Sequence, residues 1–197
     1  MKRILIVIPV YQYPTPECIE SVINLISIYR ETYDITIKLI SGYAADVART
    51  NAFNLFLQTD NDYLLFLDSD IIINEFAFDK LIKADKDIIT GIYNKKTFLV
   101  QQSEVYKIVD NKFTSYNTNE IPQELFKIIA CGFGCVLLKR NLVKQMMEVS
   151  KGVPFKFIQG NPYVSEDIYF CNLLSKHNIE LWADGTAKVG HVGKNIF

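Results

Sequence analysis

The sequence predicts an α/β fold in which a mixed, mostly parallel sheet is flanked by helices. In the first half of the chain, short apolar runs alternate with stretches of helical periodicity, in the order β-α-β-α-β-α-β. Strands separated by helices in this way form parallel sheets with helices on both faces. The run from Tyr63 to Leu67 is apolar throughout and too short to cross a membrane, which is typical of a strand buried on both faces. We expect one domain over residues 1–197, because no linker, repeat or low-complexity segment interrupts the chain.

The helices of the first half have recognisable starts. Thr15 can cap a first helix with Pro16 in its first turn, after a strand over residues 3–10. Asp46 can cap a second helix after a strand over residues 35–40, and Asn74 begins a third before a strand over residues 87–93. The side chains expected to face the core are Ile19, Val22, Ile23 and Ile26 in the first helix and Ala48, Ala52, Leu55 and Phe56 in the second.

The second half changes character. Strand-like pieces over residues 98–116 surround a hairpin turn at Asp110-Asn111. Two more pieces, over residues 126–131 and 135–139, are separated by Gly132-Phe133-Gly134, and residues 141–148 are helical. After an irregular loop over residues 151–164, Ser165-Glu166-Asp167 opens another helix with Phe170, Leu173 and Leu174 facing inward. A last strand over residues 180–183 leads to Gly190-His191.

The composition excludes several classes of function. The chain is 49% hydrophobic and 22% charged with a net charge of -1, so it is globular and has no bulk basic field for nucleic acid. Its apolar runs are too short for a transmembrane helix, which leaves peripheral contact as the only membrane association expected. Met1-Lys2-Arg3 looks like a signal start, but a short apolar part without a cleavage site favours a first core strand.

The four cysteines are scattered, and none has the Cys-His spacing of a zinc site. We expect buried thiols in a cytoplasmic protein, within the host cytoplasm if the chain is viral. A bridge between Cys131 and Cys135 is the alternative.

Asp68 and Asp70 follow the buried run directly and carry the strongest functional signal. If the strand continues, both side chains point to the same face at the carboxyl edge of the sheet, where ligands of open α/β sheets bind. Carboxylate oxygens suit Mg²⁺ or Mn²⁺, which also takes phosphate oxygens from a substrate. The alternative is a pair of surface aspartates at a strand end.

Residues after the first two strands are expected at the same edge. Arg49 and Asn51, in the first turn of the second helix, would favour an anion such as phosphate, or else form a solvated helix start. Asp46 is either a helix cap alone or also a hydrogen-bonding group for a base or ribose. Tyr11, in the loop after Pro9, either stacks on a nucleobase or packs ordinarily.

Three residues of the second half are further candidates. Glu166 and Asp167 at a helix N-terminus are explained by the helix dipole alone, but a carboxylate there could also act as a general base. His191 lies in a Gly-His-Val-Gly setting that permits close backbone approach, so it is either structural or a metal ligand.

Taken in order, these motifs resemble the glycosyltransferases of the GT-A fold, most closely the small family-2-like enzymes, including virus-encoded members. The resemblance covers most of the chain. Its parts are Ile4-Leu5-Ile6-Val7-Ile8-Pro9-Val10-Tyr11, Val47-Ala48-Arg49-Thr50-Asn51, Leu65-Phe66-Leu67-Asp68-Ser69-Asp70, Gly132-Phe133-Gly134-Cys135-Val136-Leu137-Leu138, Ser165-Glu166-Asp167 and Gly190-His191.

The resemblance implies roles for these residues. Asp70 would hold Mn²⁺ or Mg²⁺ on the diphosphate of a UDP- or GDP-sugar, with Asp68 on the ribose or close to the metal and His191 completing the metal shell. Asp167 would be the base of an inverting reaction towards a glycan, lipid or glycoprotein acceptor, with Glu166 beside it. The donor would lie on the nucleotide-binding half, residues 1–94, against Pro9, Tyr11, Asp46, Arg49, Asn51 and Asp68, and the acceptor on residues 95–197. The Gly132-Phe133-Gly134 region would line the acceptor or donor-sugar pocket.

Some features depart from the family pattern or allow other interpretations. No Gln-x-x-Arg-Trp motif follows Glu166-Asp167, which argues against a processive polysaccharide synthase. A phosphohydrolase of the haloacid-dehalogenase type also places Asp-x-Asp after an apolar strand, but normally after the first one. A nucleotidyltransferase normally has a glycine-rich loop after the first strand, and residues 9–14 contain no glycine. An inactive sugar-nucleotide-binding or structural module on the same scaffold stays open.

Overall fold

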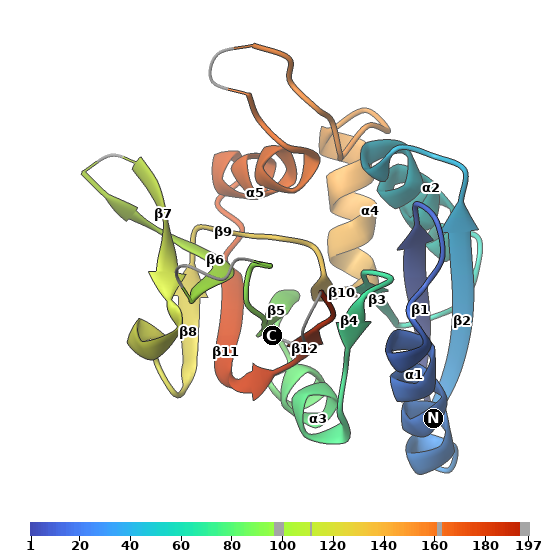
Figure 1. Cartoon of the computed structure of the whole chain (residues 1–197). Coiled ribbons are helices and arrows are strands. Elements are labelled where there is room, and N and C mark those ends of the chain that lie inside the picture. Colours follow the sequence, from blue (N-terminus) through green and yellow to red (C-terminus); the bar gives the residue numbers. More distant parts are fainter. Residues whose placement is uncertain (97–100, 111, 161–162, 194–197) are drawn as a thin grey trace.

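The computed structural model describes residues 1–96, 101–110, 112–160 and 163–193 (Figure 1). Its centre is a seven-stranded sheet in the order β2-β1-β3-β10-β5-β11-β8. The strands are β1 (Lys2–Val10), β2 (Tyr33–Ser41), β3 (Tyr63–Leu67), β5 (Ile88–Ile92), β8 (Leu125–Ile128), β10 (Cys135–Lys139) and β11 (Leu181–Lys188).

The central sheet is mixed, because strands of the second half are inserted among those of the first. β1 runs parallel to both β2 and β3, and β11 runs parallel to β5. β10 lies between β3 and β5 and is antiparallel to both, and β8 is antiparallel to β11. β1, β2, β3, β5 and β11 therefore all point the same way, so the predicted mostly parallel sheet is confirmed. Strands from residues 1–94 and from residues 95–197 both belong to it.

Five α-helices cover the two faces of the sheet. They are α1 (Pro16–Tyr29), α2 (Ala45–Leu57), α3 (Glu75–Lys83), α4 (Arg140–Val149) and α5 (Glu166–Lys176). Leu5 and Val7 of β1 pack in one core cluster with apolar residues of α2, α4 and α5. Ile4 and Ile6, which alternate with them, pack in a second cluster with α1 and α3. The alternation along one strand thus assigns the helices to opposite faces.

Two small sheets flank the central one. β4 (Ile71–Ile72) pairs with β12 (Gly190–His191), and β6 (Gln102–Val109) pairs with β7 (Lys112–Asn117) and β9 (Ala130–Cys131). A short 3₁₀ helix, η1, spans Thr118–Glu120. β6 and β7 form the predicted hairpin; residues 98–100 and 111 of that prediction lie outside the described residues.

Helix starts agree with the sequence at two positions and differ at a third. The side chains of Thr15 and Asn74 accept hydrogen bonds from backbone N–H groups of α1 and α3. The prediction that Asp46 caps α2 was wrong. Ala44 is the N-cap and offers no side-chain hydrogen bond, while the Asp46 carboxylate only accepts from the N–H of Val47, at 2.9 Å. Asp46 therefore stabilises the first turn as a charge near the helix dipole.

Three other predictions need correction. Ile23 of α1 is 57% exposed, and Cys18 and Leu25 are buried instead, because the buried stripe is rotated by part of a turn. The piece over residues 126–131 is two strands in different sheets, β8 and β9. The last strand extends to Lys188 rather than Ala183, with an irregularity that Gly185 accommodates: a Cβ there would lie 1.6 Å from the carbonyl oxygen of Pro122.

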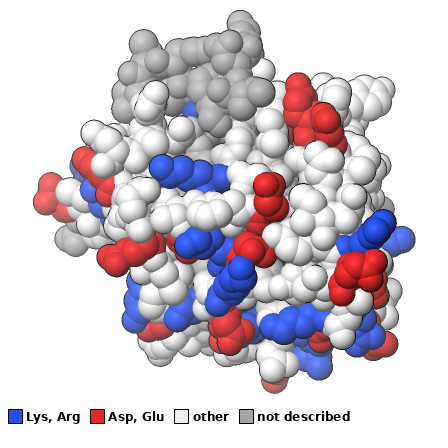
Figure 2. Space-filling view, turned by 90° about the horizontal axis from the view of Figure 1, so that it is seen from below, with Lys and Arg blue, Asp and Glu red and all other residues white. Residues whose placement is uncertain are grey.

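The face seen from below mixes charges of both signs. Lys and Arg side chains are interspersed with Asp and Glu across it (Figure 2). In the part of the chain that the structure describes, no helix combines the length and apolarity needed to cross a bilayer.

Candidate active site

A cavity of about 390 Å³ opens at the carboxyl ends of β1, β3 and β5. This is the edge where ligands of open α/β sheets bind, and the volume is within the range of small-molecule sites. Its lining residues are Pro9, Val10, Tyr11, Tyr43, Ala45, Ala48, Arg49, Asp68, Ser69, Asp70, Tyr93, Glu104, Gly132, Phe133, Glu166, Asp167 and His191. The tertiary structure thus brings together most of the residues that the sequence singled out.

A larger hollow of about 670 Å³ lies elsewhere, near the amino ends of β1 and β2. Met1, Arg3, Ile26 and Tyr33 are among its lining residues. It contains none of the predicted site residues and lies at the edge of the sheet opposite to the usual ligand edge. We therefore place the candidate site in the smaller cavity.

Asp68, Ser69 and Asp70 form a turn, so the strand does not continue through them. β3 ends at Leu67, and the N–H of Ile71 donates to the carbonyl of Asp68 at 3.0 Å. Backbone bonds from Thr15 to Ser69 (2.8 Å), from Val192 to Asp70 (2.7 Å) and from Asp68 to Gly134 (2.9 Å) hold this turn from three sides. Both carboxylates still reach the cavity because the turn, rather than strand alternation, presents them.

Asp70 and His191 lie next to each other through the small β4–β12 sheet. The Nδ1 atom of His191 is 2.7 Å from the carbonyl oxygen of Asn94. A carbonyl oxygen only accepts hydrogen bonds, so Nδ1 carries the proton. In the neutral imidazole the lone pair therefore lies on Nε2, which is 3.5 Å from Asp70 Oδ1. One backbone carbonyl thus prepares Nε2 as a ligand facing a carboxylate.

Asp70 also has a positively charged neighbour within the protein. Lys96 Nζ forms an ion pair with its second carboxylate oxygen. Burial raises the pKa of the Asp70 carboxyl, but the neighbouring His191 and Lys96 together outweigh burial and lower the pKa below its ordinary value. The carboxylate is therefore held ionised by positive and hydrogen-bonding neighbours.

The residues around Asp70 fit a divalent cation. Among the described residues, no group of three or more His, Cys, Asp or Glu side chains is arranged to hold a metal by itself. Mg²⁺ and Mn²⁺ sites that act on nucleotides commonly have only one or two protein ligands, with phosphate oxygens supplying others. A carboxylate and an imidazole Nε2 in this position match such a site.

Arg49 lies in the second turn of α2, not in the first turn as predicted. Its guanidinium forms ion pairs with Asp68, at 3.0 Å between Nη2 and Oδ1, and with Glu166 through Nη1. Only 5% of Arg49 is exposed. The prediction that Arg49 and Asn51 offer anion-binding groups at a helix start needs correction, because the arginine is engaged by two carboxylates and Asn51 is not among the cavity-lining residues.

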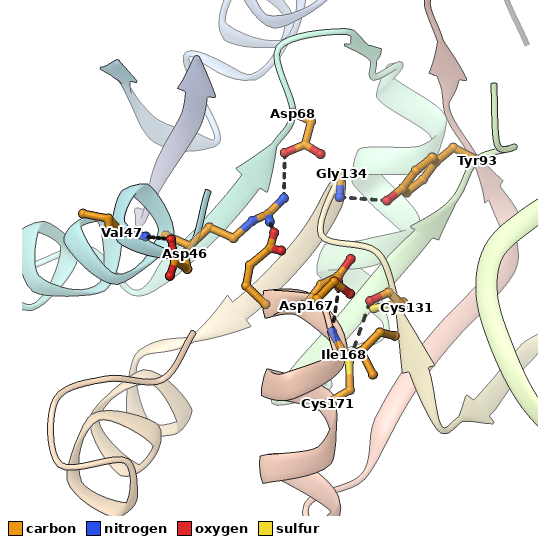
Figure 3. A network of polar contacts seen from close by, with 12 residues as sticks. Asp46, Val47, Asp68, Tyr93, Cys131, Gly134, Asp167, Ile168 and Cys171 are labelled. Atoms are coloured by element: carbon orange, nitrogen blue, oxygen red, sulfur yellow. Dashed lines mark hydrogen bonds and ion pairs between the residues drawn. The ribbon is translucent and has the colours of Figure 1, made fainter. Parts of the chain in front are cut away.

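Glu166 and Asp167 open α5 but have different surroundings, and Figure 3 shows Asp167 with its bond from Ile168. Glu166 is buried in its ion pair with Arg49. Asp167 lines the cavity; its Oδ1 accepts from the N–H of Ile168 at 2.7 Å and from the hydroxyl of Ser165. The second oxygen of Asp167 has no hydrogen bond within the described parts of the chain. Of the two residues, Glu166 is buried and paired with Arg49, whereas Asp167 is half-buried, so Asp167 is the more accessible carboxylate.

Sequence reasoning missed Glu104 and Tyr93. Glu104 projects from β6 into the cavity, and the hydroxyl of Tyr106 donates to its Oε2 at 2.7 Å. Tyr93 is buried, and its hydroxyl accepts from the N–H of Gly134 at 2.8 Å (Figure 3). Burial raises the pKa of Tyr93 well above its ordinary value. Neither residue stands in a recognisable motif, so only the packing of β6 near the loop before β10 identifies them.

Gly132 and Gly134 are glycines because Tyr93 approaches closely. A Cβ at Gly132 would lie 2.5 Å from the Tyr93 hydroxyl oxygen, and one at Gly134 would lie 2.7 Å from its ring. Any larger residue would displace the tyrosine. The predicted pocket-lining role of this segment is thus combined with a packing requirement.

The donor-side residues predicted after β1 lie at the mouth of the cavity. Pro9 and Tyr11 line it, and Tyr11 is 88% exposed, so the ring makes little packing contact. Tyr43, after β2, also lines the cavity and is 53% exposed. Two exposed tyrosines from neighbouring loops can offer flat surfaces to a ligand.

The cavity is strongly acidic. Five carboxylates line it, namely Asp68, Asp70, Glu104, Glu166 and Asp167, against Arg49 and the imidazole of His191 among the described residues, with Lys96 paired to Asp70. A phosphate-bearing ligand would need additional positive charge to bind there. The charge distribution therefore favours a bound cation.

No known protein family matches the sequence, and no match was found among curated proteins. Solved structures do match in fold. The viral protein A197 of STIV has a TM-score of 0.63 and 22% identity over 97% of this chain and 86% of its own. A Drosophila β1,4-galactosyltransferase 7 mutant, in complex with manganese, UDP-Gal and xylobiose, has a TM-score of 0.57 and 13% identity over 98% of this chain and 71% of its own.

A third match is more distant. The 4-diphosphocytidyl-2C-methyl-D-erythritol synthase of Anaerococcus prevotii has a TM-score of 0.50 and 14% identity over 95% of this chain and 89% of its own. At these identities the likeness concerns the fold alone. The chain has the GT-A fold, a Rossmann-like nucleotide-diphospho-sugar transferase fold, as the sequence predicted.

Proposed function

We propose that this protein is a metal-dependent glycosyltransferase that moves a sugar from a UDP- or GDP-sugar to an acceptor hydroxyl. One observation carries the proposal: in a GT-A fold, a single cavity is lined by Asp70 beside His191 Nε2 and by Asp167, which has an available oxygen. The first pair suits a metal-bound diphosphate, and the third group suits a base. The acceptor is a glycan, lipid or glycoprotein hydroxyl.

In this proposal Asp70 and His191 hold Mn²⁺ or Mg²⁺, with Asp68 beside them. When bound, the metal supplies a Lewis acid that neutralises charge on the departing diphosphate. Lys96, now on Asp70, is close enough to provide further positive charge. Tyr11 and Tyr43 border the place where the nucleotide enters.

Asp167 takes the proton of the acceptor hydroxyl in an inverting displacement. The acceptor oxygen forms a bond to the anomeric carbon while the bond from that carbon to the diphosphate breaks, through an oxocarbenium-like transition state. Bonds from Ser165 and Ile168 to Oδ1 orient the carboxylate and leave Oδ2 for the proton. Glu166 is a poorer candidate for base because Arg49 occupies it.

The rival functions have less support. The Asp-Ser-Asp turn follows β3, whereas a haloacid-dehalogenase-type phosphohydrolase carries its motif after the first strand. A nucleotidyltransferase would have a glycine-rich loop after β1, and residues 9–14 have none. An inactive binding module would not need a second, oriented carboxylate such as Asp167 in the same cavity.

A donor panel tests the proposal. The protein is incubated with UDP- and GDP-sugars and Mn²⁺, and release of the nucleoside diphosphate is measured with and without EDTA. We expect release with one donor class, abolished by EDTA and by Asp70→Asn, and reduced at least about 100-fold by Asp167→Asn. Asp60→Asn, an exposed aspartate paired with Arg3 away from the cavity, is the control and should keep full activity.

Three outcomes would contradict parts of the proposal. Release of inorganic phosphate instead of nucleoside diphosphate would indicate a phosphohydrolase. Full activity of Asp70→Asn would remove the metal role of Asp70. A product that retains the anomeric configuration of the donor, determined by NMR, would remove the single-displacement role of Asp167.

A further inference from the structure

The Arg49 side chain connects three elements that carry different parts of the candidate site. Arg49 projects from α2, Asp68 follows β3 on the metal side, and Glu166 opens α5 immediately before Asp167. Its two Nη atoms bind one carboxylate each. The side-chain exposures are 6% for Arg49 and 8% for Glu166, so this ion pair is largely shielded from water, whereas the Asp68 side chain is 35% exposed.

The arginine is also supported from beneath. Its guanidinium carbon lies 5.6 Å from the centre of the Phe133 ring, which is 1% exposed. Phe133 packs against Phe66, at 5.7 Å between ring centres, and against Phe170 of α5, at 5.1 Å. Arg49 therefore rests on an aromatic layer that includes residues of the same elements it bridges.

One feature of Arg49 is not explained by stability. Its Nε atom is buried and has no hydrogen-bond partner within the described structure. A buried donor without a partner is unfavourable, and buried ion pairs are weak contributors to stability. An apolar residue in the same space would avoid both costs. The arrangement is therefore better explained by what it positions than by what it stabilises.

We propose that Arg49 is a positioning residue that joins the Asp68–Asp70 turn to the N-terminus of α5, with Glu166 as its buried counter-ion. The kinetic part of this inference rests on the proposed function. The distance between the Asp68–Asp70 turn and Asp167 is then set by a side chain that binds one carboxylate on each side, rather than by loops alone. Reaction rates depend steeply on such distances, and a misplacement of about 1 Å can cost about 100-fold.

The test compares Arg49→Lys, Glu166→Gln and the double variant with Arg140→Lys as the matched control. Lysine keeps the positive charge but cannot bind two carboxylates in a planar fork. Arg140 is equally anchored, with hydrogen bonds to the carbonyls of Asn61, Phe56 and Thr59 and a Phe56 ring at 4.5 Å, but it lies outside the cavity. Its variant reports the effect of losing a structural arginine.

Three measurements are made on each variant. Mn²⁺ and UDP binding are measured by calorimetry, kcat and KM by donor turnover, and backbone hydrogen exchange at the first turn of α5 by mass spectrometry. We expect Arg49→Lys to lower kcat about 10- to 100-fold, while KM and UDP affinity change less than about 3-fold. Exchange at the first turn of α5 should rise in Arg49→Lys and Glu166→Gln but not in Arg140→Lys. The double variant should be no slower than the slower single variant.

The failures are distinguishable. If Arg49→Lys weakens UDP binding in proportion to kcat, Arg49 contacts phosphate and the inference is overturned. The inference would also be overturned if the loss of kcat in the double variant equalled the product of the two single losses. Unchanged backbone hydrogen exchange at the first turn of α5 would overturn it as well. Without turnover of any sugar donor the proposed function fails, but the exchange comparison still decides the bridging. If Arg49→Lys does not fold, Glu166→Gln provides the same comparison from the other partner.

Discussion

His191 illustrates at the residue scale how one hydrogen bond determines what a side chain can do. Bonding of Nδ1 to the carbonyl of Asn94 leaves the Nε2 lone pair directed toward Asp70. A histidine with the proton on Nε2 could not offer that nitrogen to a metal ion. Tyr93 packs edge-on against the imidazole at 5.4 Å and restrains the ring orientation.

We predict that His191→Ala weakens Mn²⁺ binding in the presence of UDP by about 10-fold or more, because the variant loses an oriented ligand. His177→Ala is the matched control, since it removes the other histidine of the chain, which is exposed at the end of α5. Binding is measured by calorimetry at a pH where imidazole is neutral. Equal affinities in the two variants would remove His191 from the metal site.

The starts of α2 and α3 show at the element scale which local signals control helix boundaries. Asn74 accepts from the N–H of Ala77 at 2.8 Å, as a capping side chain does. Asp46 lies inside the helix and bonds only the next residue. Asn74 and Asp46 have similar capping propensity but different roles. The loop before α2 ends two residues earlier than predicted, so Asp46 lies inside the helix and is not its N-cap.

Asn74→Ala should lower the free energy of unfolding by about 1 kcal/mol, the usual value of an N-cap. Asn74 also donates to the carbonyl of Lys188 at 3.1 Å, so its loss affects the contact with β11 as well. Asp46→Ala is the comparison and should cost less than about 0.5 kcal/mol, because only a charge near the helix dipole is lost. Urea unfolding of both variants measures the difference, and a larger loss for Asp46→Ala would refute the assignment of the caps.

At the scale of the whole molecule, the core contains groups that favour their neutral forms. All four cysteines are free and buried. Burial raises the pKa of the Cys18 thiol to about 12, with the negative charge of Asp70 adding to the effect, and burial raises the pKa of Cys135 to about 12 as well. The unfolded chain would release these protons near the ordinary value of 9.0.

The neutral buried thiols should therefore contribute fully to the stability of the folded state below pH 9. The free energy of unfolding should fall as the pH rises from about 9 towards 12. Over that interval the unfolded chain loses protons that the folded chain retains. Urea unfolding at a series of pH values measures the slope, with Cys18→Ala and Cys135→Ala expected to reduce it. A stability that stays constant up to pH 11 would contradict the buried environment of these thiols.

The sequence was a good guide to features that depend on neighbouring residues. Short apolar runs located β1, β2, β3, β5 and β10, and the capping signals located the starts of α1 and α3. The order of motifs indicated the fold class and most of the cavity residues. These features are local because periodicity and capping act over a few residues.

The sequence did not predict the features that depend on pairing between segments far apart in the chain. The insertion of β10 between β3 and β5, and the partition of residues 125–131 into two sheets, depend on competition between strands far apart in the chain. Glu104 and Tyr93 stand in no motif, and they enter the site only because β6 packs beside the loop before β10.

The sequence by itself determined that the chain forms an α/β sheet with carboxylates at the ligand edge, because hydrophobic periodicity and the position of Asp68 and Asp70 are written in consecutive residues. Only the tertiary structure decided what each charged group does. Arg49, expected to face phosphate, is buried between Asp68 and Glu166, and Asp167 is half-buried without the arginine partner that Glu166 has. The physical reason is that the state and role of an ionisable group depend on its neighbours in space, and these come from three separate elements.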